Sequence, residues 1–233
     1  MTHFNLLTLF PDMFPGFLGQ SLAGKALEAG KWGLSTHNIR DHATDTHKTV
    51  DDTPYGGGAG MVMRPDIIEA SLLSIPKSAR GRLLYPSPRG RVFDQGLAQE
   101  LADTSHITML CGRYEGVDQR VLDAYEFEEV SLGDFILSGG EVAALAMMDA
   151  IIRLIPGVMG NNQTSIEESF TDGLLEYPHY TRPAEWQDAK GNTHTIPDVL
   201  TSGHHENIRQ WREDQSKELT KKRRPDLLPT SRE

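Results

Sequence analysis

The sequence has a single cysteine and no long uninterrupted apolar run. Because Cys111 has no second cysteine to pair with, the chain forms no internal disulfide bond, and this favours a reducing compartment. The longest apolar segment, residues 142–155, contains Arg153 and is too short to cross a bilayer. The segment Met1–Phe10 has neither the basic region nor the cleavage site of a secretion signal. We therefore expect a cytoplasmic location.

Positive charge is also scarce. Against 33 acidic residues stand 23 lysines and arginines, which gives a formal net charge of −10. This balance argues against a protein that coats nucleic acid without specificity, but it allows a nucleic-acid enzyme with a local basic surface. Lys221–Arg224 could contact phosphates, although a solvated helix end is an equal alternative. Arg182 lies beside Tyr177, His179 and Tyr180, a combination that can stack on an unpaired base.

Several common active-site motifs are absent. The glycine-rich segment Gly56–Gly60 has no Gly-Lys-Ser/Thr ending, no Gly-x-Gly-x-x-Gly follows the first expected strand, and no Gly-x-Ser-x-Gly is present. His37, His42 and His47 have no partners at zinc spacing, so we predict no structural zinc. Cys111 has no histidine in its own loop, which favours a small buried side chain over a nucleophile.

Apolar strand-like runs alternate with helical periodicity up to residue 155, which predicts an α/β domain with a largely parallel sheet. The expected strands are residues 5–10, 33–39, 82–85, 106–110 and 127–130. The expected helices are residues 17–29, 65–74, 94–101, 117–124, 142–155 and 205–220. We place the first domain at residues 1–160, a polar linker at 161–172, and a small, mainly helical C-terminal domain at 173–233.

Three glycine- or proline-bearing loops leave the expected strands, at Pro86–Gly90, Gly112–Gly116 and Leu132–Gly140. Ligands of parallel sheets bind at the carboxyl ends of strands, so these loops indicate a ligand pocket. The last loop enters the longest apolar helix, for which we expect Ser138 as the N-cap and Glu141 in the first turn. Its free backbone N–H groups could bind a small polar ligand, and the alternative is a capped turn without a ligand.

Acids and arginines near these loops and in the linker could take part in catalysis. An acid can remove a proton or hold a divalent cation, and an arginine can stabilise a developing oxyanion. Each of them, taken singly, is also typical of an ordinary surface charge. The candidates are Glu115, Asp134, Arg153, Glu167, Glu168 and Asp172.

Six separated motifs together resemble the bacterial tRNA (guanine-N1)-methyltransferases of the TrmD type. The resemblance implies an enzyme dependent on S-adenosylmethionine that methylates N1 of guanosine 37 in tRNAs with a guanosine at position 36. It also implies a SPOUT fold, in which a deep trefoil knot surrounds the cofactor, and a homodimer with a shared active site. Periodicity alone could not have indicated a knot, because knots are rare. The motifs are Pro54–Met61, Cys111–Gly116, Ser131–Glu141, Ile155–Val158, Pro178–Pro183 and Ser202–His205.

The resemblance assigns the first domain to S-adenosylmethionine binding and the C-terminal domain to tRNA binding. It implies that Arg153 lies near the reacting guanine, and that Glu115 lies near the methyl group and a Mg²⁺ ion. The residues that match the family's cofactor-binding positions are Tyr85, Pro86, Ser87, Gly112, Gly116, Leu132, Gly133, Asp134, Phe135, Ile136, Leu137, Gly139 and Gly140.

The chain departs from the family pattern at the general base. The family has an aspartate just before Ser-Phe in the linker, and this chain has Glu168, whose side chain is one methylene longer. A carboxylate can still take the N1 proton of guanine, although a misplacement of about 1 Å can cost about a hundredfold in rate. Asp172 is the competing candidate. A lesser departure is Ala59, where the family usually has proline.

Three other functions stay open from the sequence. A SPOUT methyltransferase could act on another RNA position, such as a ribose 2′-OH or a site in rRNA. A non-catalytic RNA-binding protein could keep the same fold. A phosphate-dependent nucleotide enzyme would rest on Gly56–Gly60 alone, and the missing P-loop lysine argues against it.

Overall fold

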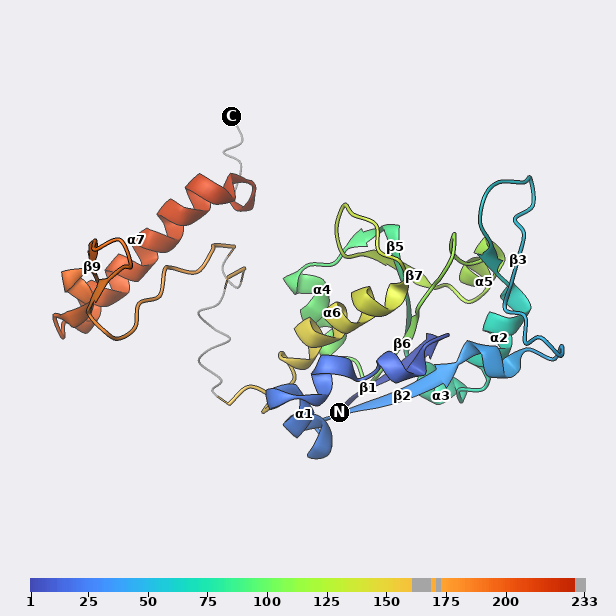
Figure 1. The fold of residues 1–233 in the computed structure, drawn as a ribbon. Coiled ribbons are helices and arrows are strands. Elements are labelled where there is room, and N and C mark those ends of the chain that lie inside the picture. The colour runs from blue at the N-terminus through green and yellow to red at the C-terminus, as the bar shows by residue number, and fades with distance from the viewer. Residues whose placement is uncertain (161–168, 171–172, 229–233) are drawn as a thin grey trace. The chain divides into compact units, whose positions relative to one another are not determined.

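The computed structural model describes residues 1–160, 169–170 and 173–228. The chain divides into two compact units, Met1–Asn162 and Gln163–Glu233 (Figure 1). Each unit is described by itself below. Within the described residues, the helices are all too short or too polar to span a membrane.

A parallel sheet of five strands forms the centre of the N-terminal unit. The strand order is β2-β1-β6-β5-β7, and every neighbouring pair is parallel. The strands are β1 (Thr2–Thr8), β2 (Trp32–Asn38), β5 (Arg82–Val92), β6 (His106–Leu110) and β7 (Glu128–Ser131). Leu6 of β1 pairs with Thr36 of β2 on one side and with Met109 of β6 on the other. The predicted α/β domain with a largely parallel sheet is therefore confirmed.

Helices cover both faces of this sheet (Figure 1). They are α1 (Ser21–Glu28), α2 (Pro65–Leu73), α3 (Lys77–Arg80), α4 (Gln95–Ala102), α5 (Gln119–Ala124) and α6 (Gly140–Ile152). Successive side chains of a strand point to opposite faces. Leu6 accordingly packs in the core with residues of α1, α4 and α6, whereas Leu7 packs in the second core with residues of α2 and α5. Both leucines are fully buried.

Several local predictions are confirmed. Strand β6 has the predicted bounds. Asp94 caps α4, because its Oδ1 accepts a hydrogen bond of 2.8 Å from the N–H of Leu97. Strands β1, β2 and β7 and helices α2, α5 and α6 lie at the predicted places, with ends that differ by a few residues.

Strand β5 does not stop at Pro86, as the sequence predicted. It continues to Val92, and its pairing with β7 shifts between Pro86 and Arg91. Pro86 is the last residue paired with β7 before this shift, and prolines within sheets are confined to edges and irregular positions of this kind. Gly90 also allows a close approach, since a β carbon on it would lie 2.1 Å from the backbone carbon of Glu129.

The predicted helix over residues 17–29 is split into two pieces. A 3₁₀ turn, η2 (Gly16–Gly19), precedes α1, because the chain folds tightly at this point. A β carbon on Gly24 would lie 2.3 Å from the backbone oxygen of Gly19. The loop Leu132–Gly140 holds a second correction. Ser138 does not cap α6: the N-cap is Gly139, and no side chain bonds to the helix start.

The long polar segment after β2 contains little regular structure, but its end is anchored to the loop that follows β6. It holds the 3₁₀ turn η3 (Ile39–His42) and a short hairpin of β3 (Asp51–Asp52) and β4 (Val62–Met63). Another 3₁₀ turn, η1 (Pro11–Met13), lies earlier in the chain, between β1 and η2. The N–H of Met63 donates to Gly116 O (2.9 Å), and the N–H of Glu115 donates to Met61 O (2.9 Å). These bonds bring residues 54–63 to the carboxyl end of β6.

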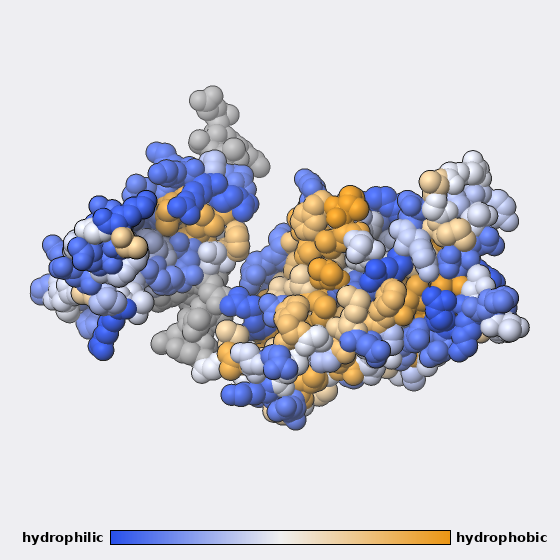
Figure 2. All heavy atoms as spheres, viewed as in Figure 1, coloured by the Kyte–Doolittle hydropathy of each residue, from blue (hydrophilic) through white to orange (hydrophobic). Residues whose placement is uncertain are grey.

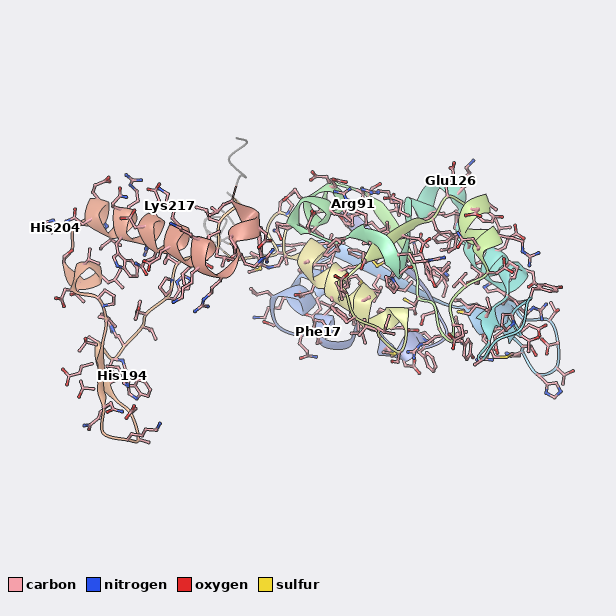
Figure 3. All side chains as sticks on the ribbon, turned by 90° about the horizontal axis from the view of Figure 1, so that it is seen from above. Phe17, Arg91, Glu126, His194, His204 and Lys217 are labelled. Atoms are coloured by element: carbon pink, nitrogen blue, oxygen red, sulfur yellow. The ribbon has the colours of Figure 1, made fainter. Side chains whose placement is uncertain are left out.

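The C-terminal unit has one long helix and a two-stranded hairpin. Its elements are β8 (Glu185–Gln187), β9 (Thr193–Thr195), η4 (Asp198–Thr201), α7 (His205–Arg223) and η5 (Pro225–Leu227). Helix α7 runs three residues beyond the predicted end, so it includes most of the basic run. Thr220 is fully buried, donates to Ser216 O (2.7 Å) and accepts from the N–H of Leu175 (2.8 Å). Figure 3 shows His194 on the hairpin and Lys217 on α7.

Candidate active site

A pocket of about 310 Å³ lies where β5, β6 and β7 present their irregular or terminal segments. Its walls come from residues 85–88, 112–116, 130–133 and 135–140, together with Ala143 of α6. Every residue predicted to bind the cofactor lines this pocket except Asp134, and Glu115 lines it too. Seven further residues line the pocket that were not named as cofactor-binding residues: Pro88, Arg113, Tyr114, Val130, Ser131, Ser138 and Ala143. Pro88, Arg113, Tyr114 and Ser138 lie within the three loops that were predicted to form a ligand pocket. Val130 and Ser131 directly precede the third loop and Ala143 follows it, so proximity in sequence was the available signal for these three.

Two glycines hold the pocket open by allowing a close backbone approach. A β carbon on Gly112 would lie 2.8 Å from Cε2 of Tyr85, and one on Gly140 would lie 2.8 Å from Cα of Cys111. The N–H of Gly140 also donates to Gly112 O over 2.9 Å, which ties the start of α6 to the loop after β6. Side chains at these two positions would displace the loop backbone, so glycine keeps the polar backbone groups accessible to a ligand.

Tyr85 and Cys111 are buried and neutral. Burial raises the pKa of the Tyr85 phenol above its ordinary value, so this side chain offers a hydroxyl group at neutral pH. Burial, and then the nearby Glu141 carboxylate, raise the pKa of the Cys111 thiol well above its ordinary value. A thiol with a raised pKa is a poor nucleophile. Cys111 is therefore a packing residue, as the sequence favoured.

Glu115 is the acid of the pocket wall, and the segment before β4 positions it. Gly60 has a φ of +87°, and a β carbon on it would lie 2.3 Å from Cγ of Glu115. The side chain of Glu115 therefore packs against the backbone of Gly60, which only glycine permits at that φ. The glycine-rich segment Gly56–Gly60 thus supports an acidic residue of the pocket.

Arg113 and Glu141 form an ion pair beneath the pocket. Nε of Arg113 lies 2.9 Å from Oε2 of Glu141, whose side chain is fully buried. Glu141 stands in the first turn of α6, as the sequence predicted. Its partners, Arg113 and Thr8, lie far away in the sequence, so no local signal could have indicated the pair.

Arg153 lies elsewhere in the unit. It follows the last residue of α6, where its N–H donates to Asp149 O over 3.2 Å. It lines a separate cavity of about 260 Å³, together with Phe17, Leu22 and Val158 among others. The N-terminal unit therefore does not bring Arg153 together with Glu115. Glu167, Glu168 and Asp172 lie outside the described residues.

The described residues do not offer a preassembled metal site. In residues 1–160, 169–170 and 173–228, no group of three or more histidine, cysteine, aspartate or glutamate side chains is close enough to hold a metal ion. Glu115 is the acid among the pocket-lining residues that could contribute to one.

Comparisons with known proteins show the family of the chain. The family model described as tRNA (Guanine-1)-methyltransferase TrmD matches residues 2–230. The chain is 60% identical over 222 residues to a protein of Bartonella tribocorum, covering 95% of this chain and 93% of that protein. It is 57% identical over 226 residues to a protein of Mesorhizobium japonicum, covering 96% and 95%.

A protein of Rhodospirillum rubrum is 57% identical over 222 residues, covering 95% of this chain and 90% of that protein. All three relatives are named tRNA (guanine-N(1)-)-methyltransferase. The family match covers nearly the whole chain, and these identities extend over both units. The chain therefore belongs to the tRNA (guanine-1)-methyltransferase TrmD family.

Proposed function

We propose that the protein transfers a methyl group from S-adenosylmethionine to N1 of guanosine 37 in tRNAs that carry a guanosine at position 36. The observation that carries this proposal is the glycine-lined pocket at the ends of β5, β6 and β7, in a chain of this family. The position in the tRNA and the methyl donor come from the resemblance.

The pocket suits a nucleoside cofactor. Its volume of about 310 Å³ lies at the lower end of the range typical of small-molecule sites. Its walls combine backbone groups freed by Gly112 and Gly140 with apolar side chains such as Leu132 and Phe135. Backbone N–H and C=O groups can read an adenine edge, and apolar side chains can cover its faces. Bound here, S-adenosylmethionine supplies a methyl group on a sulfonium sulfur, and its transfer to N1 leaves S-adenosylhomocysteine.

Three side chains share the chemistry in this proposal. Glu168 accepts the N1 proton of guanine, so the N1 lone pair is free to form the new bond to carbon. Arg153 stabilises the negative charge that develops on O6. Glu115, in the pocket wall, orients the groups beside the reacting methyl. Guanosine 37 must leave its stack to reach the pocket, which costs a few kcal/mol.

We also infer a homodimer in which each active site draws on both subunits. Arg153 follows the C-terminal end of α6, and the pocket lies at its N-terminal end. Thirteen helical residues separate these ends by about 20 Å. An arginine at that distance reaches a reacting base more readily from a second copy of the chain than from its own.

The surface around α6 suits such a partner. Hydrophobic side chains gather there in Figure 2, and Phe17, Leu22 and Val142 are exposed by 58%, 42% and 50%. Figure 3 shows Phe17 at the edge of the unit. Contiguous exposed apolar residues mark interaction sites on soluble proteins. We infer that a second copy covers this face.

We infer that the C-terminal unit binds the tRNA. Its long helix ends in Lys221, Lys222 and Arg223, all exposed, and cations near phosphates supply much of RNA affinity. The guanidinium of Arg212 on α7 lies 4.8 Å from the ring centroid of Tyr177, so the helix presents an arginine at cation–π distance from an aromatic ring. A cytoplasmic location follows for an enzyme that acts on tRNA.

A trefoil knot in the N-terminal unit is part of the same proposal. The support is the close passage of the Leu132–Gly140 segment behind the loop after β6. Gly139 packs against Arg113, and Gly140 packs against the backbone of Cys111. These approaches are tighter than a side chain would allow, as expected where one segment is drawn through another.

The first test is a methyl-transfer assay with labelled S-adenosylmethionine. One tRNA transcript carries guanosines at positions 36 and 37, a second has adenosine at 37, and the products are digested and identified as nucleosides. We expect 1-methylguanosine from the first transcript only. Another methylated nucleoside would instead indicate a SPOUT enzyme with a different RNA target, and absence of cofactor binding would favour a non-catalytic RNA-binding protein. The same assay with a chelator measures the dependence on Mg²⁺.

Glu168→Gln tests the general base. Removal of a general base typically lowers the rate by about 10²–10⁴-fold, and we expect this loss at normal cofactor affinity. Asp172→Asn is the matched variant, and a larger loss there would move the role to Asp172. Full activity of Glu168→Gln would refute the assignment.

The shared site has its own test. When S-adenosylmethionine is held near the wild-type KM, Arg153→Ala and Gly112→Ala chains are each expected to lose most of their activity, the first through slower chemistry and the second through weaker cofactor binding. When they are co-expressed, a mixed dimer has one site with both defects and one with neither. We expect activity to return to a substantial fraction of the wild-type value per mixed dimer. If each site belonged to a single chain, mixing would restore nothing.

A further inference from the structure

Glu141 is a fully buried carboxylate that the proposed chemistry does not use. Its side chain accepts a hydrogen bond of 2.9 Å from Oγ1 of Thr8 through Oε1, and its Oε2 lies 2.9 Å from Nε of Arg113. The second contact is an ion pair and not an aligned hydrogen bond. A buried charge is costly unless it is paired, so a carboxylate at this point needs both partners. These partners come from the end of β1 and from the loop after β6.

Arg113 connects Glu141 to the pocket. It lines the pocket, and its Nη1 donates a long hydrogen bond of 3.4 Å to Ser138 O. A β carbon on Gly139 would lie 2.4 Å from Nε of Arg113, so the side chain rests against the backbone of the loop that enters α6. The Arg113 guanidinium therefore contacts the Leu132–Gly140 segment, which forms one wall of the cofactor pocket.

The other side of Arg113 is held by the segment after β1. Its guanidinium carbon lies 4.4 Å from the ring centroid of Phe10, at cation–π distance. The N–H of Phe10 donates to Oγ1 of Thr8 over 3.0 Å, and Thr8 in turn donates to Glu141. These contacts thus connect Thr8, Glu141, Arg113 and Phe10 in a closed ring, in which each residue contacts the next.

We propose that Glu141 is a positioning residue, which acts through Arg113 to hold the Leu132–Gly140 segment in the conformation that binds the cofactor. Thr8 anchors Glu141 to β1. This inference rests on the proposed function for the identity of the cofactor, and its structural part, the fixing of the segment, stands without it. It goes beyond that function because Glu141 touches neither the pocket nor the reacting atoms.

Loss of the Glu141 charge should act on binding rather than on chemistry. Arg113 is 21% exposed, so without its partner it can turn toward water and leave the loop. The ligand-free segment would then sample other conformations, and the apparent affinity falls by the fraction that remains competent. Once the cofactor is bound, the segment is in place again. The KM for S-adenosylmethionine should therefore rise while kcat at saturation changes little.

The test compares Glu141→Gln with Glu100→Gln, which alters an exposed ion pair of the same unit, 3.2 Å from Arg91. We expect Glu141→Gln to raise the Kd of S-adenosylmethionine, measured by calorimetry, by about tenfold or more, with kcat within about threefold. Glu100→Gln should leave both within about twofold, since exposed pairs contribute little. Hydrogen exchange of residues 132–140 without ligand should become faster in Glu141→Gln only.

A double variant separates positioning from general stability. In Arg113→Met/Glu141→Met both charges are replaced by apolar side chains of similar length, a change that often preserves or improves stability. We expect its melting temperature to approach the wild-type value while the Kd stays raised and residues 132–140 still exchange quickly. A double variant in which both the Kd and the exchange of residues 132–140 return to wild-type values would overturn the proposal. A folded Glu141→Gln variant with a normal Kd and normal exchange would overturn it as well.

The exchange measurement also separates this inference from the proposed function. If wild-type protein fails to bind S-adenosylmethionine, the proposed function fails, and the exchange of residues 132–140 still decides whether Glu141 fixes them. If Glu141→Gln does not fold, Thr8→Val supplies the milder variant, because it removes one hydroxyl donor and keeps the side-chain volume. We expect a smaller increase in exchange of the same residues, and unchanged exchange would count against the proposal.

Discussion

Tyr85 and Gly112 are packed so closely that a β carbon on Gly112 would lie 2.8 Å from Cε2 and 2.9 Å from the hydroxyl oxygen of Tyr85. Tyr85 is 7% exposed, so its ring has little room to move away. The contact joins β5 to the loop after β6 across the pocket. The pocket keeps its width at this point because Gly112 has no side chain that would push against the Tyr85 ring.

Gly112→Ala should weaken cofactor binding. Overpacking a well-packed site typically costs about 1–3 kcal/mol, and we expect a rise in Kd of about ten- to a hundredfold. Calorimetry with S-adenosylhomocysteine measures this without turnover. Gly96→Ala in α4 is the control, because a β carbon there meets only the Asp94 side chain at 3.3 Å. An unchanged Kd in Gly112→Ala would show that the ring yields freely.

Gly60→Ala should lower the rate through Glu115. The substitution places a β carbon 2.3 Å from Cγ of Glu115, and the positive φ of +87° adds backbone strain. In Gly30→Ala the φ of +67° causes similar backbone strain, but the new β carbon meets no atom within 4 Å. This variant therefore separates the effect of backbone strain from the displacement of the Glu115 side chain. We expect kcat/KM to fall by about tenfold or more in Gly60→Ala and to change little in Gly30→Ala. Equal effects would mean that strain alone is responsible.

Acidification should destabilise the N-terminal unit through its histidines. Burial, and then the nearby His42 and His3, lower the pKa of His37 below 6.5, and burial and His106 likewise lower the pKa of His3. The unfolded chain therefore binds protons at a higher pH than the native protein does. The stability that depends on these neutral histidines is fully present above their pKa in the unfolded chain. It is lost as the pH falls through about 6.5 toward their lower pKa values in the native protein.

Urea unfolding at about pH 8 and about pH 5.5 measures this loss, in a range above the titration of most carboxylates. The ring Nε2 of His37 is buried without a hydrogen-bond partner, so no acceptor offsets the cost of burying the positive charge when this nitrogen is protonated. We expect His37→Gln to flatten the dependence of the free energy of unfolding on pH. An identical dependence in wild type and variant would exclude His37 as a contributor.

Cys111 should be unreactive in the native protein. Its side chain is fully buried and its thiol pKa is raised well above the ordinary value. We expect a disulfide reagent to label the thiol slowly under native conditions and rapidly in denaturant, since the thiolate is the reactive form. Cys111→Ala should keep kcat within about threefold, whereas loss of a nucleophile costs several orders of magnitude.

Sequence patterns predicted the parts of the fold that depend on local or periodic signals. The bounds of β6 follow from a short apolar run, and the capping role of Asp94 follows from its place before a helix. The convergence of Pro86–Gly90, Gly112–Gly116 and Leu132–Gly140 was also predictable, because the carboxyl ends of parallel strands lie at one edge of the sheet. Pro86–Gly90 nevertheless proves to be an irregular part of β5 and not a loop after it. Most of the pocket wall could therefore be named from the sequence.

The features that the sequence could not predict depend on contacts between residues that lie far apart in the chain. Thr8 and Glu141 are 133 residues apart, and neither position carries a pattern that points to the other. The continuation of β5 beyond Pro86 depends on its pairing with β7, which outweighs the local proline signal. The separation of Arg153 from the pocket depends on the length and direction of α6.

The strand order has a consequence for synthesis of the chain on the ribosome. Strand β6 lies between β1 and β5, which are both made before it, so the sheet stays divided until residue 110 has emerged. The pocket also needs β7 and the start of α6, up to Ala143. Such long-range pairings form late, because the intervening chain must first be ordered. A nascent chain therefore completes the pocket in one late step, when nearly the whole N-terminal unit has left the exit tunnel.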